Sequence, residues 1–211
     1  MRTFTVLLLS GLLALAAVGA HAQTGEQPFV LVRTPTGYLF VGNESKAHFS
    51  FALHGQKIRP SNLEGMAFFV DERLYQVLTV DPSSFAPGEG SARAILDRYM
   101  QYEASHWQAT VGMEMPSIVH ARSDSPGTPP FLLWEIQWTE QARQKTKAQA
   151  IKQLFLSAVA GDRVVVVSRT VLEGEDAGSA LSDLSAIAQS LVIRDAPIDV
   201  SEIQGKIRDE P

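Results

Sequence analysis

The sequence predicts an α+β protein in which an antiparallel β-sheet built from hairpins is covered by two or more helices. Short apolar segments recur along the chain between turn-forming residues such as Gly, Pro and Asp, a pattern typical of antiparallel strands. Two other segments, far apart in the chain, repeat apolar residues at helical spacing. Hydrophobic residues make up 45% of the chain and charged residues 19%, so the chain has enough apolar surface to fold.

The amino-terminal half is predicted to form successive hairpins. Thr34 to Gly37 reads Thr-Pro-Thr-Gly, a turn between two apolar segments, and Asp71 to Arg73 is a polar break of hairpin length. Phe49, Phe51 and Leu53 alternate with smaller or more polar residues, which places all three on one face of a half-buried strand. The strands predicted in this half cover residues 29–32, 38–41, 48–54, 66–70 and 74–80.

Two helices are predicted. The first runs from Ser91, a suitable N-cap, to about Trp107 and carries an apolar stripe. The second covers residues 179–191 and is expected to lie on the sheet. Four of its apolar residues recur at helical spacing and are expected to face the sheet: Leu181, Leu184, Ile187 and Leu191.

The second half supplies further strands. The two longest are joined through Gly161, which suits the positive φ of a tight hairpin turn. Residues 195–211 contain few large apolar groups and two prolines, so we expect a loosely ordered tail with one short strand around 198–200. The strands predicted in this half cover residues 118–121, 131–138, 151–159 and 163–172.

One aromatic group has two interpretations. Trp134, Trp138 and Phe155 lie on the predicted strands and would suit either a ligand pocket or a packed core. Trp134 and Trp138 fall on the same face of their strand, as a core sheet face requires. The alternation therefore favours the core.

The arrangement of the second half resembles the PsbP/DcrB-like family of exported proteins. The matching residues are the hairpin Gln153-Leu-Phe-Leu…Gly161-Asp-Arg-Val-Val-Val-Val167 and the helix that closes on Ser190-Leu-Val-Ile193. The similarity covers residues 131–194, while the additional hairpins between Phe29 and Val80 depart from the family pattern. Members of this family look like accessory proteins of the envelope or thylakoid lumen, so the resemblance implies assembly or binding rather than catalysis.

The amino terminus predicts export. Arg2 is followed by an uncharged apolar run from Phe4 to Val18 and then by Ala20-His21-Ala22, the small-x-small pattern of a signal-peptidase site. The apolar run is short for a spanning helix, and no cysteine is present for lipid attachment, so we expect no stable membrane anchor. The expected organisation is a signal peptide at 1–22, one α+β domain at 23–194 and the tail at 195–211, in a periplasmic or secreted, soluble protein.

Composition argues against several kinds of chemistry. The chain has no cysteine, which excludes disulfides, thiolate metal sites and a cysteine nucleophile. Its formal net charge of −5 gives no general attraction for nucleic acid. The glycine-rich nucleotide-binding motifs and the G-x-S-x-G nucleophile motif are absent, so no cofactor, metal or catalytic serine is predicted.

The histidines leave one catalytic alternative open. His48 and His54 share a strand face but are about 20 Å apart at the rise of a strand, too far to bind one metal ion. His106 ends the first helix, and His120 is on a strand that could lie beneath it, so both are candidates for a site shared with Glu103. The other interpretation gives each histidine an ordinary structural partner.

A cluster of cations stands out in this acidic chain. Arg143, Lys145, Lys147 and Lys152 lie within ten residues, with Glu140 as the nearby acid. The functional interpretation is a contact with an anionic partner, such as phosphate, lipopolysaccharide or an acidic protein face. The structural interpretation is an exposed arm whose charges keep an edge strand from pairing with other chains.

These observations lead to two functional hypotheses. The first is an exported accessory or binding protein of the bacterial cell envelope without enzymatic activity, with an envelope protein or an anionic ligand as partner. The alternative is a small periplasmic hydrolase that uses His106 or His120. The sequence alone determines neither the partner, the oligomeric state nor the order of strands.

Overall fold

The computed structural model describes residues 28–61, 66–123 and 127–209. These residues form eleven strands and four α-helices, and every strand pairing is antiparallel, which confirms the α+β class. The predicted signal peptide lies outside the described residues.

The first sheet, here called sheet A, has the strand order β1-β2-β3-β11. Its strands are β1 (Phe29–Thr34), β2 (Gly37–Glu44), β3 (Ala47–His54) and β11 (Val192–Arg194). Phe49, Phe51 and Leu53 are all buried on one face, as their alternation predicts. Sheet A therefore combines the first hairpins with a strand from the carboxy-terminal part of the chain.

The second sheet, here called sheet B, has the order β4-β5-β6-β10-β9-β8-β7. Its strands are β4 (Ile58–Pro60), β5 (Met66–Val70), β6 (Arg73–Val80), β7 (Ser117–Ser123), β8 (Phe131–Gln137), β9 (Ala150–Ala160) and β10 (Arg163–Leu172). The long hairpin β9–β10 lies inside the sheet. The expected single sheet is thus divided into two, because the hairpins at 29–54 pack over sheet B instead of extending it.

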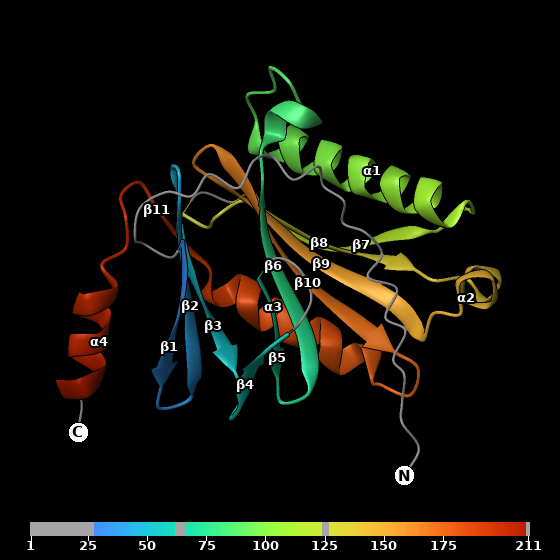
Figure 1. Ribbon diagram of the computed structural model, residues 1–211. Coiled ribbons are helices and arrows are strands. Elements are labelled where there is room, and N and C mark those ends of the chain that lie inside the picture. The colour runs from blue at the N-terminus through green and yellow to red at the C-terminus, as the bar shows by residue number, and fades with distance from the viewer. Residues whose placement is uncertain (1–27, 62–65, 124–126, 210–211) are drawn as a thin grey trace, which may run out of the picture.

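Helix α3 (Ala177–Ser190) lies against strands of both sheets, and sheet A and α3 cover the same face of sheet B (Figure 1). Leu184, Ile187 and Leu191 are buried in the core that they share, and Leu181 packs at its border. Phe40 of sheet A stacks on Phe68 of sheet B, with 6.0 Å between the ring centroids. The predicted docking of this helix is therefore confirmed.

Helix α1 (Ala92–Val111) covers the opposite face of sheet B and defines a second core (Figure 1). It begins after Ser91, whose hydroxyl accepts a hydrogen bond from the Ala94 amide, and it ends at Gly112, which adopts the left-handed conformation. Trp134 is fully buried in this core and stacks on Phe155 at 4.3 Å between centroids. The core interpretation of this aromatic group is correct.

Two helices were not expected from the sequence. Helix α2 (Glu140–Thr146) occupies the segment that joins β8 to β9, and helix α4 (Val200–Asp209) lies in the predicted loose tail, where it contacts β1. The short strand expected around 198–200 is wrong. The backbone of Ile198 is instead bound by the side-chain amide of Asn43, which donates one hydrogen bond at 3.0 Å and accepts another at 2.9 Å.

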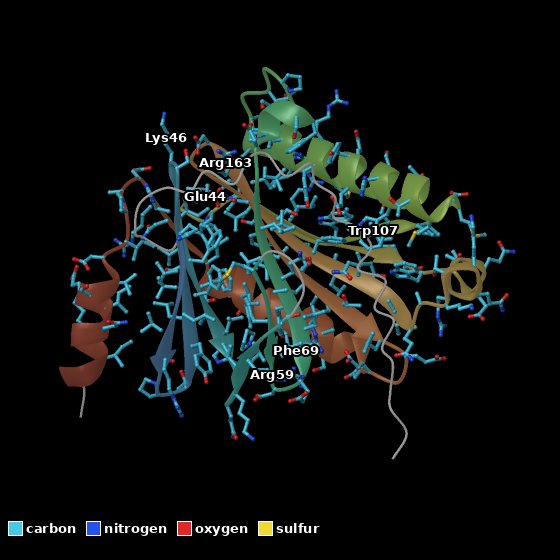
Figure 2. The ribbon with its side chains drawn as sticks, viewed as in Figure 1. Glu44, Lys46, Arg59, Phe69, Trp107 and Arg163 are labelled. Atoms are coloured by element: carbon cyan, nitrogen blue, oxygen red, sulfur yellow. The ribbon has the colours of Figure 1, made fainter. Side chains whose placement is uncertain are left out.

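The tips of two hairpins join the sheets. Asp162, in the β9–β10 turn, accepts hydrogen bonds from the Ser45 hydroxyl and the Lys46 amide in the β2–β3 turn. Gly161 has a φ of +57°, and a Cβ added there would lie 2.1 Å from the carbonyl oxygen of Lys46, so the backbones meet closely only because this residue is glycine. Figure 2 shows Lys46 at this junction, near Arg163.

Candidate functional site at the open edge of sheet B

Strand β7 is a long, exposed edge of sheet B. Its residues from Ser117 to Ala121 are exposed, and Ile118 and Val119 are 39% and 44% accessible, which makes them two of the exposed large hydrophobic residues in the described chain. Ile118 and Val119 are neighbours on a strand, so they occupy opposite faces of the sheet. The edge therefore presents apolar surface on both faces.

The other sheet edges are shorter or covered. Strand β4 has three residues and ends at Pro60, which has no amide hydrogen to donate, and β11 also has three residues. Strand β1 is contacted by helix α4. Short strands, proline and covering elements are the means by which proteins protect sheet edges from pairing. By this comparison β7 is the least protected edge in the described part of the chain.

The backbone of β7 has hydrogen-bonding groups directed away from the sheet. The backbone N–H of Gln137 donates a hydrogen bond to the backbone carbonyl of Pro116 at 2.9 Å, which makes Pro116 and Gln137 a hydrogen-bonded pair. Hydrogen-bonded and non-hydrogen-bonded pairs alternate in antiparallel sheets. Ser117 and Val119 are therefore non-bonded partners of β8, and their N–H and C=O groups point outward.

His120 lies at an irregularity in β7. The register with β8 shifts between Val119 and Ala121, so His120 is an extra residue in the strand. Its Nε2 atom lies 2.8 Å from Glu135 Oε2. The imidazole therefore lies on the face of sheet B that carries Glu135, the face that Ile118 also occupies.

Glu135 is a buried carboxylate with several donors. Its side chain is 2% exposed. Besides the contact with His120, it accepts a hydrogen bond from Lys152 Nζ at 2.9 Å and another from the side-chain amide of Gln137 (Nε2) at 2.8 Å. Burial acts to raise the pKa of Glu135, but the hydrogen bonds from Gln137, Lys152 and His120 outweigh it and hold the pKa below its ordinary value. The cluster therefore keeps an ionised carboxylate beside an accessible imidazole, an arrangement that can orient a general base.

The predicted cation cluster is dispersed over several structural roles. Arg143, in α2, forms ion pairs with Glu140 and Glu173, and Lys145 donates to the Val111 carbonyl at the end of α1. Lys152 binds Glu135, and Lys147 is exposed and ends α2 in a left-handed conformation. These contacts show partners within the chain for Arg143, Lys145 and Lys152, while contact with an anionic partner stays a prediction.

The expected site shared by His106, His120 and Glu103 does not form. Glu103 is on α1, which packs on one face of sheet B, whereas His120 binds Glu135 on the other face. Glu103 accepts a hydrogen bond from Trp107 Nε1 at 2.8 Å. Burial raises the pKa of Glu103, although this hydrogen bond and the nearby His106 oppose the shift. The packing of α1 on one face of sheet B and the position of His120 on the other separate residues that the sequence placed side by side.

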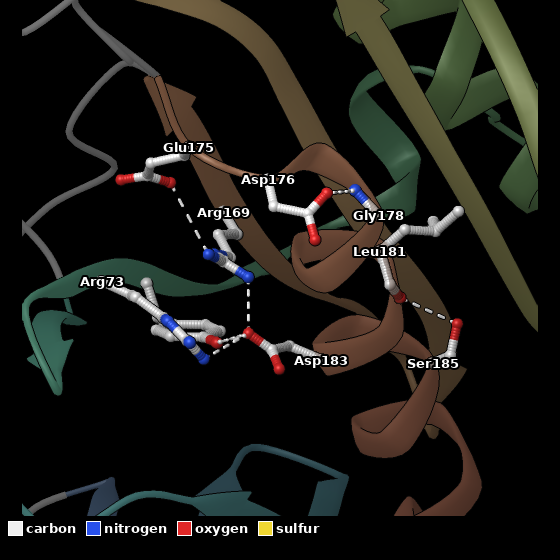
Figure 3. Close-up of polar contacts among 9 residues, drawn as sticks. Arg73, Arg169, Glu175, Asp176, Gly178, Leu181, Asp183 and Ser185 are labelled. Carbon is white, nitrogen blue, oxygen red and sulfur yellow. Dashed lines mark hydrogen bonds and ion pairs between the residues drawn. The ribbon is translucent and has the colours of Figure 1, made fainter. Parts of the chain in front are cut away.

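A second polar cluster lies beneath α3 and was not foreseen (Figure 3). Arg169 is 3% exposed, and its guanidinium donates to Asp183 on α3; Tyr75 and Arg73 donate to the same carboxylate oxygen. Burial, reinforced by the charge of Asp183, raises the pKa of the Tyr75 hydroxyl. Because this network joins the helix to two strands of sheet B, it fixes the position of α3.

A small hollow of about 30 Å³ adjoins the network and is lined by residues that include His54, Tyr75, Asp183 and Ile187. This volume suits a molecule of the size of water. The described residues contain no group of three or more His, Asp or Glu side chains arranged to hold a metal ion. In the same part of the chain, no helix has the length and apolarity needed to cross a membrane.

No family model matches the sequence, and no curated protein matches it. The resemblance to the PsbP/DcrB-like family therefore stays a prediction. The fold and the site define an α+β protein with two antiparallel sheets and one long, open sheet edge.

Proposed function

We propose that this chain is an exported accessory protein of the bacterial cell envelope that binds another protein chain and has no enzymatic activity. The observation that carries the binding role is the open β7 edge, where exposed Ile118 and Val119 accompany outward backbone groups. Addition of an extended segment to such an edge supplies backbone hydrogen bonds for affinity and side-chain contacts for specificity. The leader pattern at residues 1–22 supports export, and the β9–β10–α3 arrangement supports the PsbP/DcrB-like assignment as part of this proposal.

Site-specific crosslinking in cells tests the binding role. A photo-reactive phenylalanine analogue is introduced at Ile118 in the full-length chain, and the same analogue at Val192 is the matched control. Val192 is 42% exposed and also lies on an edge strand, but of sheet A. We expect a discrete crosslinked product from position 118 and none from position 192. Equal crosslinking from both positions, or none from position 118, contradicts a binding role for the β7 edge.

The mass of the exported protein tests its destination separately. If the leader is removed after Ala22, the intact mass corresponds to a chain that starts at Gln23. Retention of residues 1–22 in material recovered from the envelope contradicts the predicted cleavage.

A hydrolase remains the second candidate, and the contact of 2.8 Å between His120 and Glu135 is the observation that favours it. A carboxylate that binds one ring nitrogen of histidine can orient the other nitrogen as a general base. Purified protein is assayed with ester, phosphate, peptide and glycoside substrates beside His120→Ala and His106→Ala variants. Turnover that disappears only in His120→Ala supports the hydrolase, and turnover that persists in this variant rejects His120 as its base.

A further inference from the structure

The outward backbone groups of β7 form a pattern that is complementary to itself. Ser117 and Val119 both direct N–H and C=O groups away from β8, and they lie symmetrically on either side of Ile118. When two such strands meet antiparallel about a two-fold axis at Ile118, Ser117 of each copy faces Val119 of the other. These two pairs exchange about four backbone hydrogen bonds.

The local sequence favours one register for this pairing. Pro116 has no amide hydrogen, and the bulge at His120 interrupts the regular strand on the other side. The unbroken outward ladder thus runs from Ser117 to Val119. A shift by one residue would oppose outward groups to groups that already bond β8, so the register centred on Ile118 is favoured.

Side chains on both faces of the strand suit the same arrangement. The two Ile118 residues would lie directly opposite each other as a non-hydrogen-bonded pair, in which Cα atoms are about 4.5 Å apart. On the other face, Val119 of each copy would lie beside the small side chain of Ser117. The pairing buries on both faces the apolar surface that Ile118 and Val119 expose in a single copy.

The charges at the two ends of β7 favour an antiparallel partner. Glu114 is exposed before the amino-terminal end of the strand, whereas His120 and Arg122 follow the central segment, with Arg122 held by Asp97. An antiparallel arrangement places the Glu114 end of each copy beside the His120 and Arg122 end of the other. A parallel arrangement of two copies would instead place their exposed Glu114 carboxylates at the same end, so charge favours the antiparallel orientation.

We propose that the occupant of the β7 edge is β7 of a second copy of this chain, so that two sheets B join into one continuous sheet across a two-fold axis. This inference rests on the proposed function because it names the partner of the same edge. Assembly of this kind is isologous: each copy contributes the same surface.

Self-association of the purified protein, produced from the full-length gene, is measured by sedimentation up to a concentration of about 0.5 mM. Ile118→Lys places two ammonium groups opposite each other across the axis and is expected to weaken association by about tenfold or more. Val119→Pro removes an outward N–H without removing a hydrogen bond to β8, and is expected to weaken association as well. Val192→Lys, at an exposed residue of sheet A, is expected to leave association unchanged.

Disulfide trapping locates the axis without relying on variants that weaken the protein. The chain has no cysteine, so Ile118→Cys provides one thiol in each copy. A Cα separation of about 4.5 Å is within the range that a disulfide spans. We expect rapid formation of a covalent dimer by Ile118→Cys under mild oxidation and only slow, collisional formation by Val192→Cys.

The results separate this inference from the proposed function. Concentration-dependent dimers that are lost in Ile118→Lys and Val119→Pro, with selective trapping at position 118, support the second copy as occupant. A protein that is monomeric at about 0.5 mM, or a dimer unaffected by both variants, overturns it. If position 118 crosslinks in cells to a protein of another mass, the binding role of the edge stands and self-pairing is rejected. If position 118 gives no product in cells and the purified protein is monomeric, both are rejected.

Discussion

Removal of the charge at Asp183 is expected to destabilise the protein strongly, because Arg169 would then keep its charge in a buried environment. Arg169 is 3% exposed, and its guanidinium binds Asp183 at 2.5 Å, while Glu175, the other carboxylate near it, lies at 3.6 Å. Asn keeps the size of Asp but not its charge. Loss of one partner from a buried ion pair costs about 3–5 kcal/mol. Since Asp183 is 27% exposed and Glu175 remains, we expect about 2–3 kcal/mol for Asp183→Asn.

Urea unfolding at neutral pH measures this loss, and two further variants identify its cause. Arg169→Met combined with Asp183→Asn removes the stranded charge and should recover much of the lost free energy of unfolding, because an apolar replacement of a buried pair is often neutral. Asp97→Asn breaks the Arg122–Asp97 pair, whose side chains are partly exposed, and should cost less than about 1 kcal/mol. The reasoning is refuted if Asp183→Asn stays within about 0.5 kcal/mol of the wild type, or if the double variant is no more stable than Asp183→Asn.

Three further predictions concern the core, the junction of the sheets and the edge cluster. Leu184→Ala should cost about 2–5 kcal/mol in urea unfolding, because Leu184 is fully buried between the sheets; a loss below about 0.5 kcal/mol would contradict that packing. Gly161→Ala should lower the free energy of unfolding by about 1–3 kcal/mol, because its Cβ would collide with the Lys46 carbonyl; Gly90→Ala, where no atom lies within 4 Å, is the control and should change little. The lowered pKa of Glu135 means that its ionised form stabilises the fold above its ordinary pKa, and that this contribution is lost as pH falls through the lowered value. Thermal unfolding across acidic pH should therefore show a weaker pH dependence for Glu135→Gln than for wild type, and identical pH profiles would reject the assignment.

Local patterns in the sequence predict most strands and both long helices. Ser91 predicts the start of α1 because its hydroxyl can accept a hydrogen bond from a free amide of the first turn, and it does so from Ala94. Gly161 predicts the turn of the longest hairpin because it can adopt a positive φ, and β9 and β10 meet there. These features depend on residues close together in the chain, which is why the sequence alone shows them.

The functional geometry depends instead on contacts between distant segments. The separation into two sheets depends on packing between distant segments, such as the contact of the hairpin tip at Lys46 with the turn at Gly161, more than one hundred residues away in the chain. The bulge at His120 leaves no clear mark in a seven-residue strand, and the contact between His120 and Glu135 depends on the pairing of β7 with β8. One signal was available: Arg169 is in phase with the buried residues Val165, Val167 and Val171, and a cation within an apolar face of a strand requires a buried partner.

Strand β7 combines a side-chain pattern of an interior strand with a position at an edge. Adjacent apolar residues such as Ile118 and Val119 place hydrophobic surface on both faces, which is typical of strands that are covered on both sides. Its neighbour β8 meets that description, since five consecutive residues from Leu132 to Ile136 are buried. In β7 the same pattern is exposed. If the apolar side chain of Ile118 stabilises the fold of the single chain, Ile118→Lys should lower the free energy of unfolding of the monomer. If Ile118 serves assembly instead, Ile118→Lys should leave the unfolding transition of the monomer nearly unchanged and remove the dimer. Measurement of both quantities on one variant distinguishes a residue that maintains the fold from one that extends the sheet into a second molecule.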